Sequence, residues 1–369
     1  MRRAAGRALV AVFVLAIGGA AGCGAGGGTA TTLPAAGQTS AGQGNLVLYV
    51  AQADGDRIDA YRLGNDGLLP AEPFSTLAVT NPRRLTVSGN MLYASLGTSV
   101  ISLALASDGS LPATTSASTT PSLASSPMEV LVRNGVLYAA VSGRSRIETY
   151  TLDSDGHVGE DTLSISNPSF RNYRTLTTYG DYLYAGARAS FTIDTYLIQG
   201  DGSLPETFET QLPMPIVTMP EDITANAGII YAIDQNNERI NSYTIDDDGL
   251  LPSLADSVTD PEERYGDLLV DNGRIYASAY SAGRIDTYLL ASDGSLPSGK
   301  PAAATHADTA SFPAALTISG AVLYVAQAGL DRVDAYLLDT AGNPTSFPSS
   351  STYSMAGSFP TDIELYTLP

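Results

Sequence analysis

Residues 45–70 read NLVLYVAQADGDRIDAYRLGNDGLLP and contain three short phrases that recur along the chain. The phrases are Leu48-Tyr49, then Arg57-Ile-Asp-Ala-Tyr61, then Asp66-Gly67 followed by apolar residues. The Leu-Tyr or Ile-Tyr pair returns every 44 to 48 residues, with its tyrosine at Tyr49, Tyr93, Tyr138, Tyr184, Tyr231, Tyr276 and Tyr324. A self-similar period of this length indicates that one structural unit is repeated seven times.

Each repeat contains the signals for four short strands. Runs of Tyr, Ile, Val, Thr and Leu favour strands, and Asp-Gly between two such runs favours a tight hairpin because Gly tolerates positive φ. A second turn, such as Asn134-Gly135, precedes each Leu-Tyr pair, and one more strand, such as 85–87, precedes that turn. Four antiparallel strands in about 45 residues are typical of a propeller blade. We therefore predict an all-β, seven-bladed β-propeller over residues 45–369.

The two ends of the repeat region are complementary. The first repeat begins at Asn45 with its second strand and lacks an inner strand of its own. The last residues, Phe359-Pro-Thr-Asp-Ile-Glu-Leu365, match the inner strand of the previous repeat, Phe312-Pro-Ala-Ala-Leu-Thr-Ile318. We predict that this C-terminal strand completes the first blade and closes the ring, because an open strand edge would expose unpaired backbone groups.

The N-terminal segment has the pattern of an export signal. Arg2, Arg3 and Arg7 precede an apolar run over residues 8–17, which is short for a bilayer span, and small residues then lead to Cys23. We interpret residues 1–22 as a lipoprotein signal peptide, because the sole cysteine stands where a bacterial lipobox places the lipidated residue. Residues 23–44, rich in Gly, Ala and Thr, are predicted to be a flexible tether. An ordinary signal peptide with an incidental cysteine is the alternative.

Composition excludes several classes of function. The formal net charge of -19 argues against nucleic acid as a partner, because the chain has no basic surplus to neutralise phosphates. One cysteine and two histidines leave little for a disulfide framework, a Cys- or His-rich metal centre or His-based catalysis. No G-x-S-x-G, P-loop, H-E-x-x-H or C-x-x-C motif is present. We expect neither a metal nor a cofactor.

Charged residues gather where the inner strands begin. We call the position nine residues before each repeat tyrosine the entry position, and its predecessor the adjacent position. The entry position holds Arg84, Glu129, Thr175, Asp222, Asp267, Ala315 and, in the C-terminal strand, Asp362. The adjacent position holds Arg83, Met128, Arg174, Glu221, Gly266, Ala314 and Thr361. Inner strands of a propeller are otherwise apolar, so these charges predict a site at the mouth of the central channel. The alternative is that the residues are charged only because solvent fills the mouth of the channel, and that they have no function.

The remaining repeated residues have structural interpretations. Arg57 and Asp59 are two apart on a strand and therefore share a face, so we expect such pairs to bridge strands or neighbouring blades. The repeat tyrosines are predicted to pack blades together. Asp-rich turns such as 246–249 lack the residue spacing of a calcium-binding loop. We therefore interpret their aspartates as residues that favour the turn conformation.

The phrases Leu-Tyr-Val-Ala, Arg-Ile-Asp-Ala-Tyr and Asp-Gly-Leu-Leu-Pro together resemble the seven-bladed β-propeller lactonase family, which includes 6-phosphogluconolactonase-like proteins and is related to surface-layer-type propeller repeats. The likeness covers about residues 45–369. Family members often begin an inner strand with Gly-Pro-Arg-His, and Asn81-Pro82-Arg83-Arg84 matches this motif at Pro82 and Arg83. The resemblance implies a propeller fold and the hydrolysis of lactones.

Two functions fit these observations. The first is hydrolysis of a small lactone or cyclic ester, with Glu129 or Asp222 as general base and Arg84 stabilising the oxyanion, while Arg83, Arg174 and Glu221 bind the substrate. The second is a non-catalytic propeller scaffold of the cell envelope that binds a small ligand or an envelope protein with the same face. In either case we expect an exported monomer, a lipoprotein of the bacterial cell envelope that meets the membrane only through its lipid anchor.

Overall fold

The computed structural model describes residues 45–113, 118–120, 123, 125, 127–166, 169–213, 219–353 and 357–369. The predicted signal peptide, Cys23 and the tether lie outside these residues. In the described part of the chain, no helix is long and apolar enough to span a bilayer.

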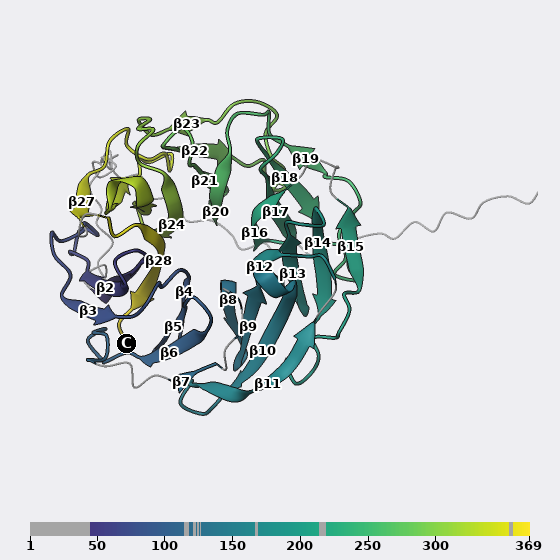
Figure 1. Cartoon of the computed structure of the whole chain (residues 1–369). Coiled ribbons are helices and arrows are strands. Elements are labelled where there is room, and N and C mark those ends of the chain that lie inside the picture. Colours follow the sequence, from purple (N-terminus) through teal and green to yellow (C-terminus); the bar gives the residue numbers. More distant parts are fainter. Residues whose placement is uncertain are drawn as a thin grey trace, which may run out of the picture. The chain divides into compact units, whose positions relative to one another are not determined.

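The repeat region forms seven antiparallel sheets of four strands each, arranged in a ring (Figure 1), as the sequence predicts. The inner strands, from blade 1 to blade 7, are β28 (Pro360–Thr367), β4 (Leu85–Ser88), β8 (Pro127–Arg133), β12 (Tyr173–Tyr179), β16 (Pro220–Asn226), β20 (Tyr265–Asp271) and β24 (Pro313–Ser319). The second strands are β1 (Leu46–Gln52), β5 (Met91–Ser95), β9 (Val136–Val141), β13 (Tyr182–Ala187), β17 (Ile229–Asp234), β21 (Arg274–Ala279) and β25 (Val322–Gln327).

The third and outer strands complete each blade. The third strands are β2 (Arg57–Arg62), β6 (Val100–Ala104), β10 (Arg146–Leu152), β14 (Thr192–Leu197), β18 (Arg239–Thr244), β22 (Arg284–Leu289) and β26 (Arg332–Leu337). The outer strands are β3 (Ser75–Ala78), β7 (Ser118–Thr119), β11 (Val158–Ser166), β15 (Thr210–Pro213), β19 (Ser257–Val258), β23 (Ala303–Ala304) and β27 (Ser350–Tyr353). Two 3-10 turns, η2 (Ser142–Arg144) and η3 (Ala328–Leu330), connect second to third strands.

The C-terminal strand closes the ring, as predicted. β28 pairs antiparallel with β1 from Leu46 opposite Thr367 to Gln52 opposite Pro360. Blade 1 is therefore built from both ends of the repeat region, and inner strands β24, β28 and β4 contact one another in that order. Closure pairs the edge of β1 that would otherwise be open.

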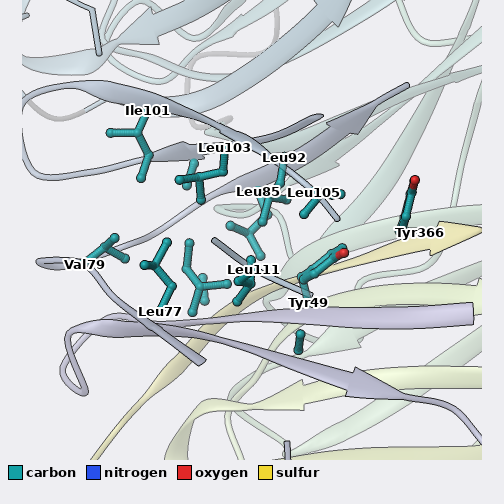
Figure 2. Close-up of a cluster of buried hydrophobic side chains, with 14 of the residues drawn as sticks. Tyr49, Leu77, Val79, Leu85, Leu92, Ile101, Leu103, Leu105, Leu111 and Tyr366 are labelled. Atoms are coloured by element: carbon teal, nitrogen blue, oxygen red, sulfur yellow. The ribbon is translucent and has the colours of Figure 1, made fainter. Parts of the chain in front are cut away.

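Apolar side chains fill the space between neighbouring blades. Figure 2 shows one such cluster, in which Tyr49 and Leu77 of blade 1 meet Leu85, Leu92 and Ile101 of blade 2. All five are buried. The second strands are buried on both faces because each one contacts the blades before and after it, which explains their nearly continuous apolar sequences.

The repeat tyrosines connect neighbouring blades through a recurring hydrogen bond. Each hydroxyl donates to the carbonyl of the glycine in the Asp-Gly turn of the next blade. In the last blade the turn is Ala-Gly. The bonds are Tyr49 to Gly109 (2.7 Å), Tyr93 to Gly156 (2.6 Å), Tyr138 to Gly202 (2.8 Å), Tyr184 to Gly249 (2.7 Å), Tyr231 to Gly294 (2.7 Å), Tyr276 to Gly342 (2.7 Å) and Tyr324 to Gly67 (2.6 Å). The tyrosines therefore pack blades together, as predicted.

The repeated Arg-x-Asp pairs stabilise single blades. Arg57 Nη2 lies 3.0 Å from Asp59 Oδ2, and the fully buried Asp59 also accepts hydrogen bonds from Gln52 of β1 (3.1 Å) and Thr76 of β3 (2.7 Å). Arg284 and Asp286 form the same pair at 2.7 Å. The pairs bridge strands, as the sequence predicts, and do so within a blade.

Candidate active site

A backbone irregularity places the charged residues at the start of the inner strands. Six of the seven inner strands show a register shift there. In blade 3, for example, Pro127 lies opposite Val141 and Glu129 opposite Ala140, so Met128 at the adjacent position is an extra residue. Such β-bulges redirect side chains at strand ends. The entry and adjacent positions therefore do not simply alternate between the two faces of the strand.

Several entry residues connect their strand to the next blade. Asp222 accepts a hydrogen bond from the backbone N–H of Leu268 at 2.9 Å, and Asp362 accepts one from Leu85 at 2.7 Å. Asp267 makes the equivalent bond to blade 7 at 2.7 Å. These carboxylates therefore help to hold neighbouring blades together.

Arg84 lies among the entry carboxylates. Its Nε is 3.8 Å from Glu129 Oε2, and its Nη1 is 3.7 Å from Asp362 Oδ1. Its Nε also donates to the carbonyl of Met128 at 3.3 Å. Burial alone would lower the pKa of Arg84, but the charges of Glu129, Asp362, Asp267 and Asp222 raise that pKa above its ordinary value. One guanidinium thus faces several partly buried carboxylates.

The cluster shifts the carboxylates toward their neutral forms. Burial raises the pKa of Glu129 to about 7; Arg84 lowers it, and the charges of Asp362 and Asp222 add to the increase. Burial also raises the pKa of Asp222. Burial and the nearby charge of Asp222 together raise the pKa of Asp267 well above its ordinary value. Glu364, two residues after Asp362 on β28, has a pKa of about 8 because it is buried beside that charge.

Glu129 differs from the other entry carboxylates in its hydrogen bonds. Its Oε1 accepts from the N–H of the following residue, Val130, at 3.0 Å. Among the hydrogen bonds described, none joins the Glu129 carboxylate to the next blade. Asp222 uses both oxygens, because Oδ1 accepts from Thr175 at 2.8 Å and Oδ2 from Leu268. Glu129 is therefore more available than Asp222 to accept a proton from water.

The adjacent position forms a second charged group. Arg174 donates from Nε and Nη2 to Glu221 Oε1 at 2.9 and 2.5 Å, and Arg188 Nε lies 3.8 Å from Glu221 Oε2. Glu221 is buried. The buried Nε of Arg83 has no hydrogen-bond partner within the described residues.

The structure thus divides the predicted site residues. Arg84, Glu129 and Asp222 meet in one electrostatic cluster, and Arg174 and Glu221 form an ion pair. Among the described residues, the Arg83 side chain makes no ion pair with either group. The sequence candidates did not include the neighbours Asp267, Asp362, Glu364 and Arg188. The first two share the entry register and carry the same sequence signal, whereas Glu364 and Arg188 have no repeated motif.

A crevice elsewhere on the propeller does not contain the site residues that the sequence predicts. This crevice, of about 470 Å³, lies between blades 3 and 4 and is lined by turn residues that include Arg133, Asp181 and Gly202. These turns are at the ends of the blades opposite the entry position. Within the described ranges, no three His, Cys, Asp or Glu side chains are arranged to hold a metal ion.

Comparison with known proteins supports the same family that the sequence phrases suggest. The family model for lactonase, 7-bladed beta-propeller, matches residues 209–360. The resemblance to the lactonase family is confirmed. No curated protein sequence matches the chain.

Solved structures confirm the propeller fold of this lactonase-like chain. A candidate 6-phosphogluconolactonase from Bacteroides fragilis superposes with a TM-score of 0.75 at 16% identity, covering 89% of this chain and 99% of the other. The periplasmic gluconolactonase PpgL from Pseudomonas aeruginosa superposes with a TM-score of 0.73 at 16% identity, covering 88% and 99%. At such identities the likeness establishes the fold alone.

Proposed function

We propose that this protein hydrolyses a small lactone or related cyclic ester at the face where the inner strands begin. The observation that carries the proposal is the Glu129 carboxylate, which lies beside Arg84 and has a pKa of about 7. A general base is most effective when its pKa lies near the working pH. The lactonase family model and the propeller fold support the same class of reaction.

The chemistry assigns distinct roles to the charged groups. Glu129 removes a proton from water, and the water oxygen attacks the lactone carbonyl carbon. Arg84 stabilises the negative charge that develops on the carbonyl oxygen, and Arg83 is a candidate for binding the substrate. The ring C–O bond then breaks, and the leaving alkoxide takes the proton back from Glu129 to give a hydroxy acid. Asp222 is the second candidate base, while Arg174 and Glu221 orient the substrate.

Turnover in a pH-stat tests this proposal. Wild type, Glu129→Gln and the control Glu160→Gln, which alters an exposed carboxylate on outer strand β11, are assayed across a panel of γ- and δ-lactones. We expect wild type and the control to hydrolyse at least one lactone, and Glu129→Gln to lose about 100-fold or more in kcat/KM. Equal rates for wild type and Glu129→Gln would remove Glu129 from the mechanism.

A non-catalytic propeller scaffold is the second candidate function. The observation that favours it is the structural use of Asp222, Asp267 and Asp362, whose carboxylates bind the backbone of the next blade. The same pH-stat assay decides between the two functions. A wild type that hydrolyses no lactone above the buffer rate would favour the scaffold, which would bind a small ligand or an envelope protein.

We also propose that the protein is exported and anchored to the bacterial envelope through a lipid on Cys23. The basic N-terminus, the short apolar run and the position of the sole cysteine support this. Cells fed an alkyne-labelled fatty acid should yield labelled wild type and unlabelled Cys23→Ser. Labelling of both proteins, or of neither, would contradict lipidation at this residue.

A further inference from the structure

Two phenylalanines stand directly before the inner strands of neighbouring blades. Phe312 precedes β24 of blade 7, and Phe359 precedes β28 of blade 1. Their backbone φ angles are 44° and 50°, in the left-handed region that bulky residues rarely adopt. The two residues are 45% and 42% exposed. Each residue thus combines backbone strain with a ring that remains open to solvent.

Two other blades show what the fold requires at this position. Asn81 in blade 2 and Asn172 in blade 4 stand, like the two phenylalanines, three residues before the entry position. Their φ angles are 50° and 53°. Asn adopts this conformation readily because its short polar side chain can hydrogen-bond locally. The backbone therefore needs no aromatic residue at this position.

The two phenylalanines flank one turn. The carbonyl of Phe312 accepts a hydrogen bond from the N–H of Ala328 at 3.1 Å, and the N–H of Phe359 donates to Asp331 Oδ1 at 2.9 Å. These partners begin and follow turn η3. A Cβ on Gly329 in the same turn would lie 2.4 Å from Phe312 Cδ2, so the ring lies against the bare glycine backbone. One turn therefore holds both residues at the face of the ring where the inner strands begin, which we call the entry face.

Blade 7 has no charged side chain at its adjacent and entry positions, although the Asp331 carboxylate lies nearby at the N–H of Phe359. Ala314, which is partly buried, and Ala315, which is buried, occupy these positions, where each other blade has at least one Arg, Glu or Asp. In blade 1, Phe359 is three residues from Asp362, whose carboxylate lies 3.7 Å from Arg84. The two exposed phenylalanine rings thus stand close in the chain to the charged cluster and add apolar surface to the entry face, where the inner strands begin.

We infer that Phe312 and Phe359 form an aromatic platform that binds an alkyl or aryl substituent of the substrate, an inference that rests on the proposed lactone hydrolysis. Phenylalanine rings favour apolar surface and offer no hydrogen-bond partners. A lactone with a hydroxyl group on each carbon would leave those groups unpaired against these rings. The platform therefore selects lactones that carry a hydrocarbon substituent.

The test uses the replacement that the other blades already contain. Wild type and Phe312→Asn/Phe359→Asn are compared on δ-decalactone, which carries a pentyl group, and on δ-valerolactone, which has the same ring without it. We expect the variant to lose about tenfold in kcat/KM on δ-decalactone and to keep its rate on δ-valerolactone. Its melting temperature should stay equal or rise, because Asn suits the backbone. Equal losses on both lactones, or no loss, would overturn the platform.

A binding measurement separates this inference from the proposed reaction. The lactam with the same ring and pentyl group resists hydrolysis, and its affinity is measured by calorimetry for wild type, the double variant and Leu254→Asn. Leu254 is 75% exposed and lies between β18 and β19, so its replacement controls for loss of surface apolarity. We expect the double variant alone to bind about tenfold more weakly. Lactam binding by wild type without lactone turnover would contradict only the reaction; equal binding by all three proteins, or binding by none, would overturn the platform.

Discussion

The hydroxyl of Tyr324 in blade 7 donates a hydrogen bond of 2.6 Å to the carbonyl of Gly67 in blade 1, across 257 residues of sequence. It is the same bond that joins every other pair of neighbouring blades, so the junction between the two ends of the ring is chemically like the rest. Tyr324 is fully buried, and burial raises its pKa above the ordinary value, so the hydroxyl remains a donor.

Removing this hydroxyl should destabilise the protein. Tyr324→Phe leaves the buried carbonyl of Gly67 without its donor, and we expect a loss of about 1–2 kcal/mol in the free energy of unfolding. Urea unfolding followed by circular dichroism measures the change. Tyr179→Phe, at a side chain that is 42% exposed, is the matched control and should change stability little. Identical midpoints for Tyr324→Phe and wild type would show that the bond contributes nothing net.

Deletion of the C-terminal strand should destabilise the whole propeller. A chain that ends at Ser358 loses β28, which exposes the edge of β1 and removes Ile363 and Tyr366 from two apolar clusters. We expect a much lower melting temperature and aggregation through the open edge. The control deletes only Pro369, which is exposed and follows the strand. A truncated protein that melts like the control would contradict ring closure through β28.

The fold was predictable because its signals are local and repeated. Asp66-Gly67 and its equivalents mark hairpins by residue type, and the Leu-Tyr pairs mark the second strands. The match between residues 359–365 and 312–318 was enough to predict β28 in blade 1, as the pairing with β1 confirms.

The site was predictable only in part. The entry position is visible because the repeats align, and the structure places Glu129 beside Arg84 and lets the charge of Asp222 act on Arg84. The β-bulges have no sequence signal, since the extra residue is Met128 in one blade and Thr361 in another. The use of Asp carboxylates as acceptors for the next blade depends on where that blade lies, which a single strand does not reveal. Positive φ at Phe312 and Phe359 contradicts the usual preference of phenylalanine, so propensity predicts the opposite.

The buried carboxylate of Glu364 should make stability depend on pH. Its pKa is about 8 in the folded protein against an ordinary value of 4.5, so between these values the native state binds more protons than the unfolded state. Stability therefore falls as pH rises through this window. Glu364→Gln stays neutral and keeps an acceptor for the N–H of Val87. We expect the variant to be more stable than wild type by about 1–3 kcal/mol at pH 8 and equal to it near pH 4.

Chemical denaturation at a series of pH values measures this effect. Glu160→Gln, which removes an exposed carboxylate on β11, should follow the wild-type curve throughout. A Glu364→Gln curve parallel to wild type between pH 4 and pH 8 would mean that the carboxylate is not protonated preferentially in the folded state.

The rate of lactone hydrolysis should also depend on pH through Glu129, and Arg84 should influence the midpoint of the pH profile. If Glu129 is the general base, kcat/KM rises as the carboxylate ionises, with a midpoint at about pH 7. Arg84 lowers the pKa of Glu129, so Arg84→Gln should move the midpoint upward by about one pH unit besides lowering the plateau. Arg62→Gln, at a side chain that is 43% exposed and pairs with Asp108, should leave the midpoint unchanged. A lower plateau with an unmoved midpoint would mean that Arg84 acts on the substrate without tuning Glu129, because loss of oxyanion stabilisation slows the reaction equally at every pH.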